Sequence, residues 1–238
     1  MPLRILTPEY DSTGISGLIL LCASSSTLAS YAKLRLARFA LDYDATYTFT
    51  LVIVILYGFL IGAPILTFRI EGGLLWLLTW LAVGLIAGFL AFYADRRIVA
   101  FIRPYWTSNV VMAASTARMA ALGASGISPA SRHSERRVPT RLLLLLASAG
   151  LEELAFRGFM LQLFLLVRPP VAEAALVIAI IPIFALTHLW FGWTQVVAKL
   201  PLGTLTLGVA LYSGSLMPAI LTHLTFNLLI WRRERIER

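Results

Sequence analysis

The stretch that decides the fold is apolar and spans residues 142–167, LLLLLASAGLEELAFRGFMLQLFLLV. It is long enough to cross the hydrocarbon core of a bilayer, which takes about 20 apolar residues in a helix. Three charged residues, Glu152, Glu153 and Arg157, nevertheless stand near its middle. A charged side chain at membrane depth is costly unless it is paired or faces a wet cavity, so the adjacent glutamates predict a functional site inside the bilayer.

The composition of the whole chain is that of a membrane protein. Of the 238 residues, 59% are hydrophobic and 13% are charged, whereas a soluble domain is roughly half apolar and one quarter charged. The single cysteine, Cys22, excludes an intramolecular disulfide and any metal site built from paired cysteines. We therefore expect an all-α fold, a polytopic transmembrane helical bundle.

Apolar runs bounded by charged residues predict about seven spans. They cover residues 14–31, 47–68, 73–94, 142–167, 171–190, 194–212 and 216–231. Residues 106–122 are moderately apolar and are consistent with an interfacial helix or with an eighth span. The segment 123–139, in which Gly, Ser, Pro and Arg cluster, is predicted to be a basic loop.

The lysines and arginines outside these runs predict the orientation. Fifteen lie in the connection between the first two spans, in the long connection between the third and fourth, and in the tail, whereas three lie on the opposite side. Because positive residues gather on the cytoplasmic side, we expect the amino terminus outside and the carboxyl terminus in the cytoplasm. The excess of arginine, 18 against 2 lysines, favours a bacterial source and so a multi-pass protein of the bacterial inner membrane.

These patterns divide the chain into three parts. Residues 1–140 are expected to form a three-span region with a long basic cytoplasmic loop, residues 141–231 a four-helix core, and residues 232–238 a basic cytoplasmic tail. The formal charge of +8 flanks apolar runs, so anionic lipid headgroups, and not nucleic acid, are the expected partners. Lys199 lies within an apolar run and is expected to extend toward the headgroups. The patterns do not indicate an oligomeric state.

The spacing of the three charged residues within residues 142–167 predicts different roles for them. Glu153 and Arg157 are four residues apart, so on a helix they share a face and can form a buried ion pair. Glu152 is rotated by about 100° from its neighbour and has no partner on its own helix. A carboxylate in a partly dry cavity is a usable general base. Two structural ion pairs, or proton conduction in a transporter, are the alternatives.

Two later apolar runs carry further polar side chains. His188 ends the motif Phe184-Ala-Leu-Thr-His188, and His223 and Asn227 are four residues apart, so they face the same way on their helix. At about 1.5 Å rise per residue, Glu152, His223 and Asn227 all fall between the midplane and the inner leaflet. We expect one site that opens toward the cytoplasm and holds an acid, a base and hydrogen-bond donors, a combination that suggests hydrolysis.

In these motifs the sequence resembles the CAAX protease and bacteriocin-processing family, also called the abortive-infection family. The family signature is Glu-Glu-x-x-x-Arg, then Phe-x-x-x-His, then His-x-x-x-Asn or Asp. The chain has these motifs in order at residues 152–157, 184–188 and 223–227, and residues 202–208 and 212–216 resemble the third conserved region of the family. The resemblance covers residues 142–231.

The resemblance implies an intramembrane endopeptidase of the glutamic type that needs no metal or other cofactor and acts on membrane-anchored protein or peptide substrates. By analogy, Glu152 with His188 would activate a water molecule, and His223 and Asn227 would donate hydrogen bonds to the oxyanion. The remaining two residues, Glu153 and Arg157, would support the site.

The same residues are compatible with two other classes of protein. In a metal-dependent membrane hydrolase, Glu152, His188 and His223 would be ligands, since two imidazoles and a carboxylate suit zinc. In a membrane scaffold or immunity protein, the fold would be kept without catalysis. Sensitivity to chelators would distinguish the first of these from a metal-free protease.

Overall fold

The structure is a computed structural model that describes residues 12–35, 43–66, 73–106, 138–167 and 169–236. Within these ranges the regular structure is entirely helical, which confirms the expected all-α class. The elements are α1 (Ser12–Arg35), α2 (Tyr43–Leu60), α3 (Gly73–Trp106), α5 (Val138–Glu153), the π-helix η3 (Leu154–Met160), α6 (Leu161–Phe164), α7 (Pro170–Leu186), the 3₁₀ turn η4 (Leu189–Phe191), α8 (Trp193–Ser213) and α9 (Leu216–Ile236).

Each apolar run expected to span the bilayer corresponds to one helical segment. The run 142–167 corresponds to α5, η3 and α6, which follow one another without a break and so form one continuous helix. Four helical segments are long and apolar enough to cross a membrane by themselves: Thr13–Arg35, Tyr43–Leu60, Gly73–Ile102 and Trp193–Ser213. The helix Pro170–Leu186 is equally apolar but shorter. The chain is therefore a multi-pass helical membrane protein.

Several helix ends differ from the expected ones. Helix α2 ends at Leu60, although the second apolar run was expected to extend to residue 68. The third helix continues past residue 94 to Trp106, so the connection that was expected to begin at Asp95 begins as helix. The helix α7 ends at Leu186, before Trp190, because Thr187 turns its hydroxyl onto the Phe184 carbonyl and the chain then forms a 3₁₀ turn. The proposed interfacial helix or eighth span at residues 106–122, and most of the basic loop at 123–139, fall outside the described residues.

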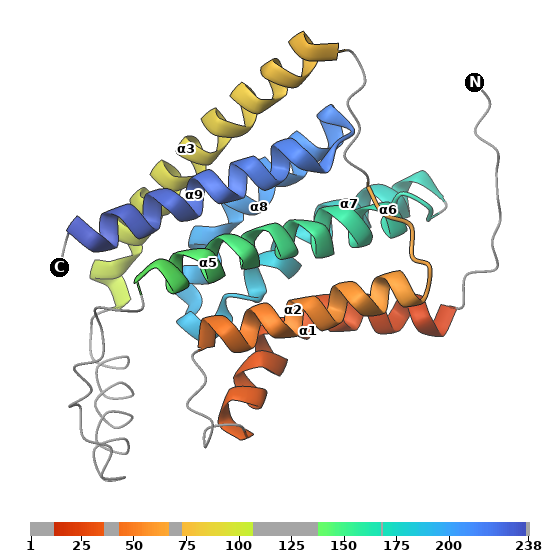
Figure 1. The fold of residues 1–238 in the computed structure, drawn as a ribbon, viewed down its shortest axis with the longest axis horizontal. Coiled ribbons are helices and arrows are strands. Elements are labelled where there is room, and N and C mark those ends of the chain that lie inside the picture. The colour runs from red at the N-terminus through yellow and green to blue at the C-terminus, as the bar shows by residue number, and fades with distance from the viewer. Residues whose placement is uncertain (1–11, 36–42, 67–72, 107–137, 168, 237–238) are drawn as a thin grey trace.

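Helices α1 and α2 pair at one side of the bundle, α3 lies at the opposite side, and α5 and α9 lie between them (Figure 1). Two glycines bring α3 close to α9. A Cβ atom at Gly84 would lie 2.8 Å from the Pro218 carbonyl oxygen, and one at Gly88 would lie 2.6 Å from the Thr222 carbonyl oxygen. The spacing Gly-x-x-x-Gly is the small-residue pattern that allows membrane helices to pack closely. This pattern allows α3 to pack closely against α9, the helix that carries His223.

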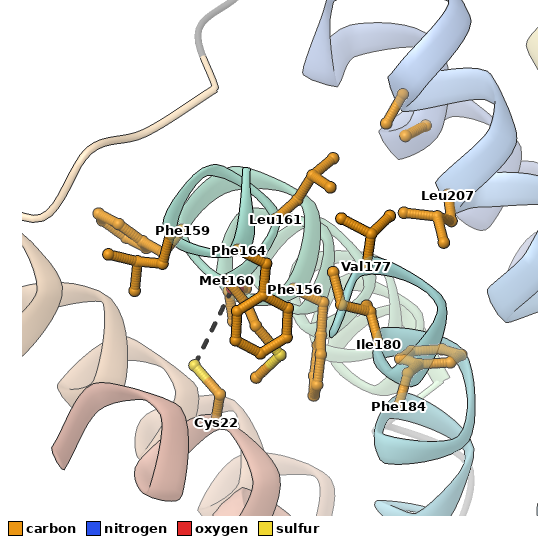
Figure 2. Close-up of a cluster of buried hydrophobic side chains, with 14 of the residues drawn as sticks. Cys22, Phe156, Phe159, Met160, Leu161, Phe164, Val177, Ile180, Phe184 and Leu207 are labelled. Carbon is orange, nitrogen blue, oxygen red and sulfur yellow. Dashed lines mark hydrogen bonds between the residues drawn. The ribbon is translucent and has the colours of Figure 1, made fainter. Parts of the chain in front are cut away.

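The apolar core is centred on the helix that carries the two glutamates. Figure 2 shows Phe156, Met160 and Phe164 from η3 and α6 packed toward Ile180 and Phe184 of α7, and each of these five side chains is at most 4% exposed. The thiol of Cys22, on α1, points to the Ala155 carbonyl oxygen at 3.9 Å (Figure 2). The core therefore joins the amino-terminal helices to the carboxyl-terminal ones and holds the helix of the site on several sides.

Candidate active site

The two glutamates lie where the helix changes its hydrogen-bonding pattern. Glu152 and Glu153 are the last residues of α5, and a seven-residue π-helix, Leu154–Met160, follows at once. Its i→i+5 pattern is visible where the Leu161 amide donates to the Phe156 carbonyl. The Gly158 carbonyl accepts a hydrogen bond of 3.0 Å from the Leu66 amide, which fixes the chain after α2 to this turn. Single π-helical turns within α-helices often occur at functional sites.

The expected ion pair between Glu153 and Arg157 is present. The guanidinium nitrogen Nη1 lies 3.3 Å from Glu153 Oε1, and both side chains are fully buried. The other terminal nitrogen, Nη2, donates to the Gly203 carbonyl of α8 at 2.9 Å. The guanidinium also lies over the ring of Phe184, with its carbon 4.5 Å from the ring centroid. Arg157 therefore ties α5, α7 and α8 together around the site.

His223 of α9 lies between the two carboxyl groups. Its Nδ1 atom is 2.8 Å from Glu153 Oε1, a hydrogen-bonding distance, and its Nε2 atom is 3.8 Å from Glu152 Oε2. The exposed fraction of the His223 residue is 2%, and that of Glu152 is 4%. The Oε2 atom of Glu152 has no hydrogen-bond partner in the described part of the chain. A buried carboxylate oxygen without a partner is costly unless it binds another polar group.

The net charge of the buried cluster depends on four side chains, those of Glu152, Glu153, Arg157 and His223. Arg157 carries one positive charge, and the two carboxyl groups carry two negative charges when both are ionised. The four side chains are therefore neutral as a group when they bind one further proton, on Glu152 or on His223. Since the group is buried, burial favours this neutral state over a net charge.

Phe184 occupies the centre of the site, a role that sequence reasoning missed. Its ring is 5.5 Å from that of Phe156, 5.4 Å from that of His188 and 5.8 Å from that of His223, in each case edge to face. The residue is fully buried. The sequence placed Phe184 in the motif Phe-x-x-x-His, four residues before His188, but gave it no role. Phe184 contacts both imidazole rings.

His188 lies just beyond the end of α7, at the start of η4. Its Nδ1 atom is 3.2 Å from the Thr187 hydroxyl, and its amide donates to the Ala185 carbonyl at 3.0 Å. Among the described side chains, no ion pair or hydrogen bond joins His188 to Glu152. The structure therefore brings His188 to the same aromatic centre as His223 but not into contact with the glutamate expected to be its partner.

Asn227 follows His223 by one helical turn on α9 and also reaches α5. Its Nδ2 atom donates a hydrogen bond of 3.1 Å to the Leu145 carbonyl oxygen. The amide nitrogen has two hydrogens, so one further donor remains for a ligand. This contact joins α9 to α5 two turns before Glu152.

The amino-terminal helix α2 places aromatic residues beside the site, although no sequence motif indicated them. Tyr47 of α2 is 8% exposed and packs near Leu151, the residue before Glu152. The ring of Tyr43 stacks on that of Tyr47 at 5.9 Å, and its edge meets Phe191 at 5.5 Å. These two tyrosines thus lie beside Glu152, from a part of the chain that sequence reasoning left without a role.

Lys199 does not extend toward the headgroups as expected. Its ammonium nitrogen is 2.6 Å from Asp95 Oδ1 on α3, and the side chains are 11% and 7% exposed. It also lies over the ring of Phe226, 4.5 Å from the centroid. The expectation was wrong because a carboxylate on a distant helix is close enough to pair with the lysine inside the bundle.

The fold and the site together define a class: a multi-pass helical membrane protein in which carboxyl, imidazole and guanidinium groups meet inside the bundle. Residues 135–229 match the model of the Rce1-like family, described as type II CAAX prenyl endopeptidase Rce1-like. The match includes every residue of the three motifs and confirms the resemblance to the CAAX protease family. That family is one of membrane endopeptidases, and protease activity is supported at this level. No curated protein matches the chain, and no solved structure matches it.

Proposed function

We propose that the protein is a glutamic-type intramembrane endopeptidase that hydrolyses a peptide bond in membrane-anchored proteins or peptides. The observation that carries the proposal is the environment of Glu152. Its carboxylate is buried, its Oε2 atom lacks a partner within the described chain, and the His223 Nε2 atom lies 3.8 Å away. The Glu152 Oε2 atom is an acceptor and the His223 Nε2 atom is a potential donor, and the two do not bond to each other. We infer that both are available to a water molecule and a scissile carbonyl.

In the proposed first step, the cluster carries its one extra proton on His223, which leaves Glu152 ionised. Glu152 takes a proton from water as the water oxygen forms a bond to the carbonyl carbon, and the carbonyl electron pair moves to the oxygen. The oxyanion accepts hydrogen bonds from the Nε2 hydrogen of His223 and from the free Nδ2 hydrogen of Asn227. Each such donor is worth about 3–4 kcal/mol in transition-state stabilisation.

In the second step, the carbon–nitrogen bond breaks and Glu152 returns its proton to the leaving nitrogen, so the products are a carboxylic acid and an amine, and the acid then releases its proton to solvent. His188 would hold the attacking water. Glu153 and Arg157 would support the site: their ion pair, at 3.3 Å, would hold the Glu153 carboxylate in place, and that carboxylate would orient His223 through Nδ1.

A cleavage assay tests the proposal. The purified protein is reconstituted in liposomes with a panel of single-span reporter proteins, and fragments are identified by mass spectrometry. Glu152→Gln should lower the cleavage rate by about 10²–10⁴-fold, the range expected on loss of a general base. Glu173→Gln, the same exchange in the first turn of α7, is the matched control and should cleave as the wild type does. Equal rates for both variants would contradict the proposal.

The metal-dependent alternative is separable in the same assay. A metal-independent protease keeps its rate after treatment with a chelator and dialysis, whereas a hydrolase with a resident zinc ion loses activity and regains it on addition of Zn²⁺. A non-catalytic scaffold leaves every reporter intact in both the wild type and the variants.

A further inference from the structure

A second polar feature lies away from the site, in a groove between α3 and α9. The groove has a volume of about 390 Å³ and is lined by Phe92 and Arg96 of α3 and by Leu229, Arg232, Arg233 and Ile236 of α9. Among the described residues, no carboxylate lines it. Each of the two helices contributes both apolar and guanidinium side chains to the lining, a combination that fits an amphipathic anion.

The acidic residues nearest in sequence have other partners. Asp95 precedes Arg96 but pairs with Lys199 at 2.6 Å, and Glu234 follows the lining arginines of α9 but faces Arg141 at 3.9 Å. Arg96 lies over the Phe92 ring, 5.9 Å from its centroid, and is exposed. Arg232 is exposed and has no ion-pair partner within the described ranges. At least two guanidinium groups at this groove therefore lack an anion from the described part of the chain.

Other arginines at the same end of the bundle are engaged differently. Arg97 donates to the Tyr93 hydroxyl, and Arg235 lies over the Trp231 ring, 4.9 Å from its centroid. Neither lines the groove. Arg97 and Arg235 therefore lie on the same two helices as Arg96 and Arg232 and carry the same charge, but they do not line the groove.

The position of the groove along the helices identifies the kind of anion. Arg96 comes two residues after the apolar run 73–94 of α3, separated from it by Asp95, and Arg232 follows directly on the apolar run 216–231 of α9, next to Trp231. Tryptophan and arginine at this point are typical of the depth of lipid headgroups. Guanidinium groups bind phosphate oxygens in bidentate fashion, and Phe92, Leu229 and Ile236 offer an apolar surface to an acyl chain.

We propose that this groove binds one anionic phospholipid, with its phosphate between Arg96 and Arg232 and an acyl chain against Phe92, Leu229 and Ile236. The bound lipid would link α3 to α9, which carries His223 and Asn227. The inference does not depend on the proposed proteolytic activity, since it concerns a different surface and a different ligand.

The test is lipid binding by the full-length protein in detergent, measured as the rise in melting temperature during titration. The probes are phosphatidylglycerol, phosphatidylcholine with the same acyl chains, and free glycerol phosphate. The test variant is Arg96→Gln with Arg232→Gln, and the control is Arg97→Gln with Arg235→Gln, which removes the same charge outside the groove. The apparent affinity of the test variant for phosphatidylglycerol should fall roughly 30-fold, from the contribution of two interfacial arginines, and that of the control should fall much less.

Three results would overturn the proposal. An equal loss in the test and control variants would show attraction to net charge alone. Equal stabilisation by phosphatidylcholine would show that the phosphatidylglycerol headgroup is not selected. Equal stabilisation by glycerol phosphate would assign the groove to a soluble anion. If the double variant does not fold, Arg96→Gln and Arg232→Gln are titrated singly, and each should weaken phosphatidylglycerol binding by about fivefold.

Discussion

The Nδ1 atom of His223 lies 2.8 Å from the Oε1 atom of Glu153, although the two residues are 70 positions apart in the chain. The same oxygen lies 3.3 Å from Arg157. The Glu153 Oε1 atom therefore contacts a guanidinium and an imidazole group on different helices, whereas the Glu152 carboxylate makes only the longer contact of 3.8 Å with His223 Nε2 among the ion pairs of the described residues. The Oε2 atoms of both glutamates are buried without a hydrogen-bond partner in this part of the chain. The close contacts of Glu153 fit a supporting carboxylate, and the looser contact of Glu152 fits a candidate base.

Loss of the supporting pair should cost folding stability as well as activity. Arg157→Met leaves the Glu153 carboxylate buried without its main counter-charge, which destabilises by about 3–5 kcal/mol. The measurement is thermal melting in detergent. Arg141→Met is the control, because its contact with Asp44, at 3.5 Å, involves half-exposed side chains and is worth about 1 kcal/mol or less. Equal melting temperatures for the wild type and Arg157→Met would show that the pair does not stabilise the fold.

The close approach of α3 to α9 predicts opposite effects for two alanine substitutions. Gly88→Ala places a Cβ atom 2.6 Å from the Thr222 carbonyl oxygen, so α9 must shift, at about 1–3 kcal/mol for overpacking. Gly150→Ala meets nothing within 4 Å and should be neutral or stabilising by up to about 1 kcal/mol, since alanine favours a helix over glycine. Melting temperatures of the two variants check this, and a Gly88→Ala protein as stable as Gly150→Ala would contradict the packing described.

The pair formed by Lys199 and Asp95 should show coupling in a double-mutant cycle. Either Lys199→Met or Asp95→Asn alone leaves the charge of its partner largely buried, and we expect each to lower stability markedly. The double variant removes both charges and should be more stable than the sum of the single losses predicts. Additive losses would mean that the contact of 2.6 Å does not contribute an interaction energy.

The orientation inferred from the basic residues is tested by thiol labelling in intact cells. In a background with Cys22→Ser, cysteine is placed at Arg235, near the end of α9, or at Ser131, which lies outside the described residues. Both positions are expected to resist an impermeant reagent until the membrane is opened, because the positive-inside rule puts them in the cytoplasm. Labelling of either in intact cells would reverse the topology and the side from which substrate is expected to reach the site.

The helices and part of the site could be predicted because they depend on local patterns. An apolar run bounded by charged residues predicts a helix, and each of the seven runs corresponds to a helical segment, although only four of the described segments are long and apolar enough to cross a membrane by themselves. The ion pair of Glu153 and Arg157 follows from their spacing of four residues on one helix. The end of α7 was less predictable, because a threonine hydroxyl bonded to Phe184 at 2.7 Å competes with continued helix inside an apolar run.

Contacts between distant segments could not be predicted in the same way. His223 and Asn227 could be placed on one helix face, but nothing local indicates that this face meets Glu153 and Leu145. Asp95 was expected at a helix end and Lys199 within a span, so their pairing depends on how α3 packs on α8. The π-helix after Glu153 has no distinct composition, and it is stabilised by tertiary contacts such as the bond from the Leu66 amide to the Gly158 carbonyl, at 3.0 Å.

The most direct test of the central proposal, that Glu152 activates water for peptide hydrolysis, is isotope incorporation. Reporter cleavage by the purified protein is carried out in H₂¹⁸O, and the new carboxyl terminus is analysed by mass spectrometry. We predict one ¹⁸O atom in that carboxyl group with the wild type and with Glu173→Gln, and no cleaved product with Glu152→Gln. Cleavage by Glu152→Gln at the wild-type rate, with the same label, would show that another group activates the water.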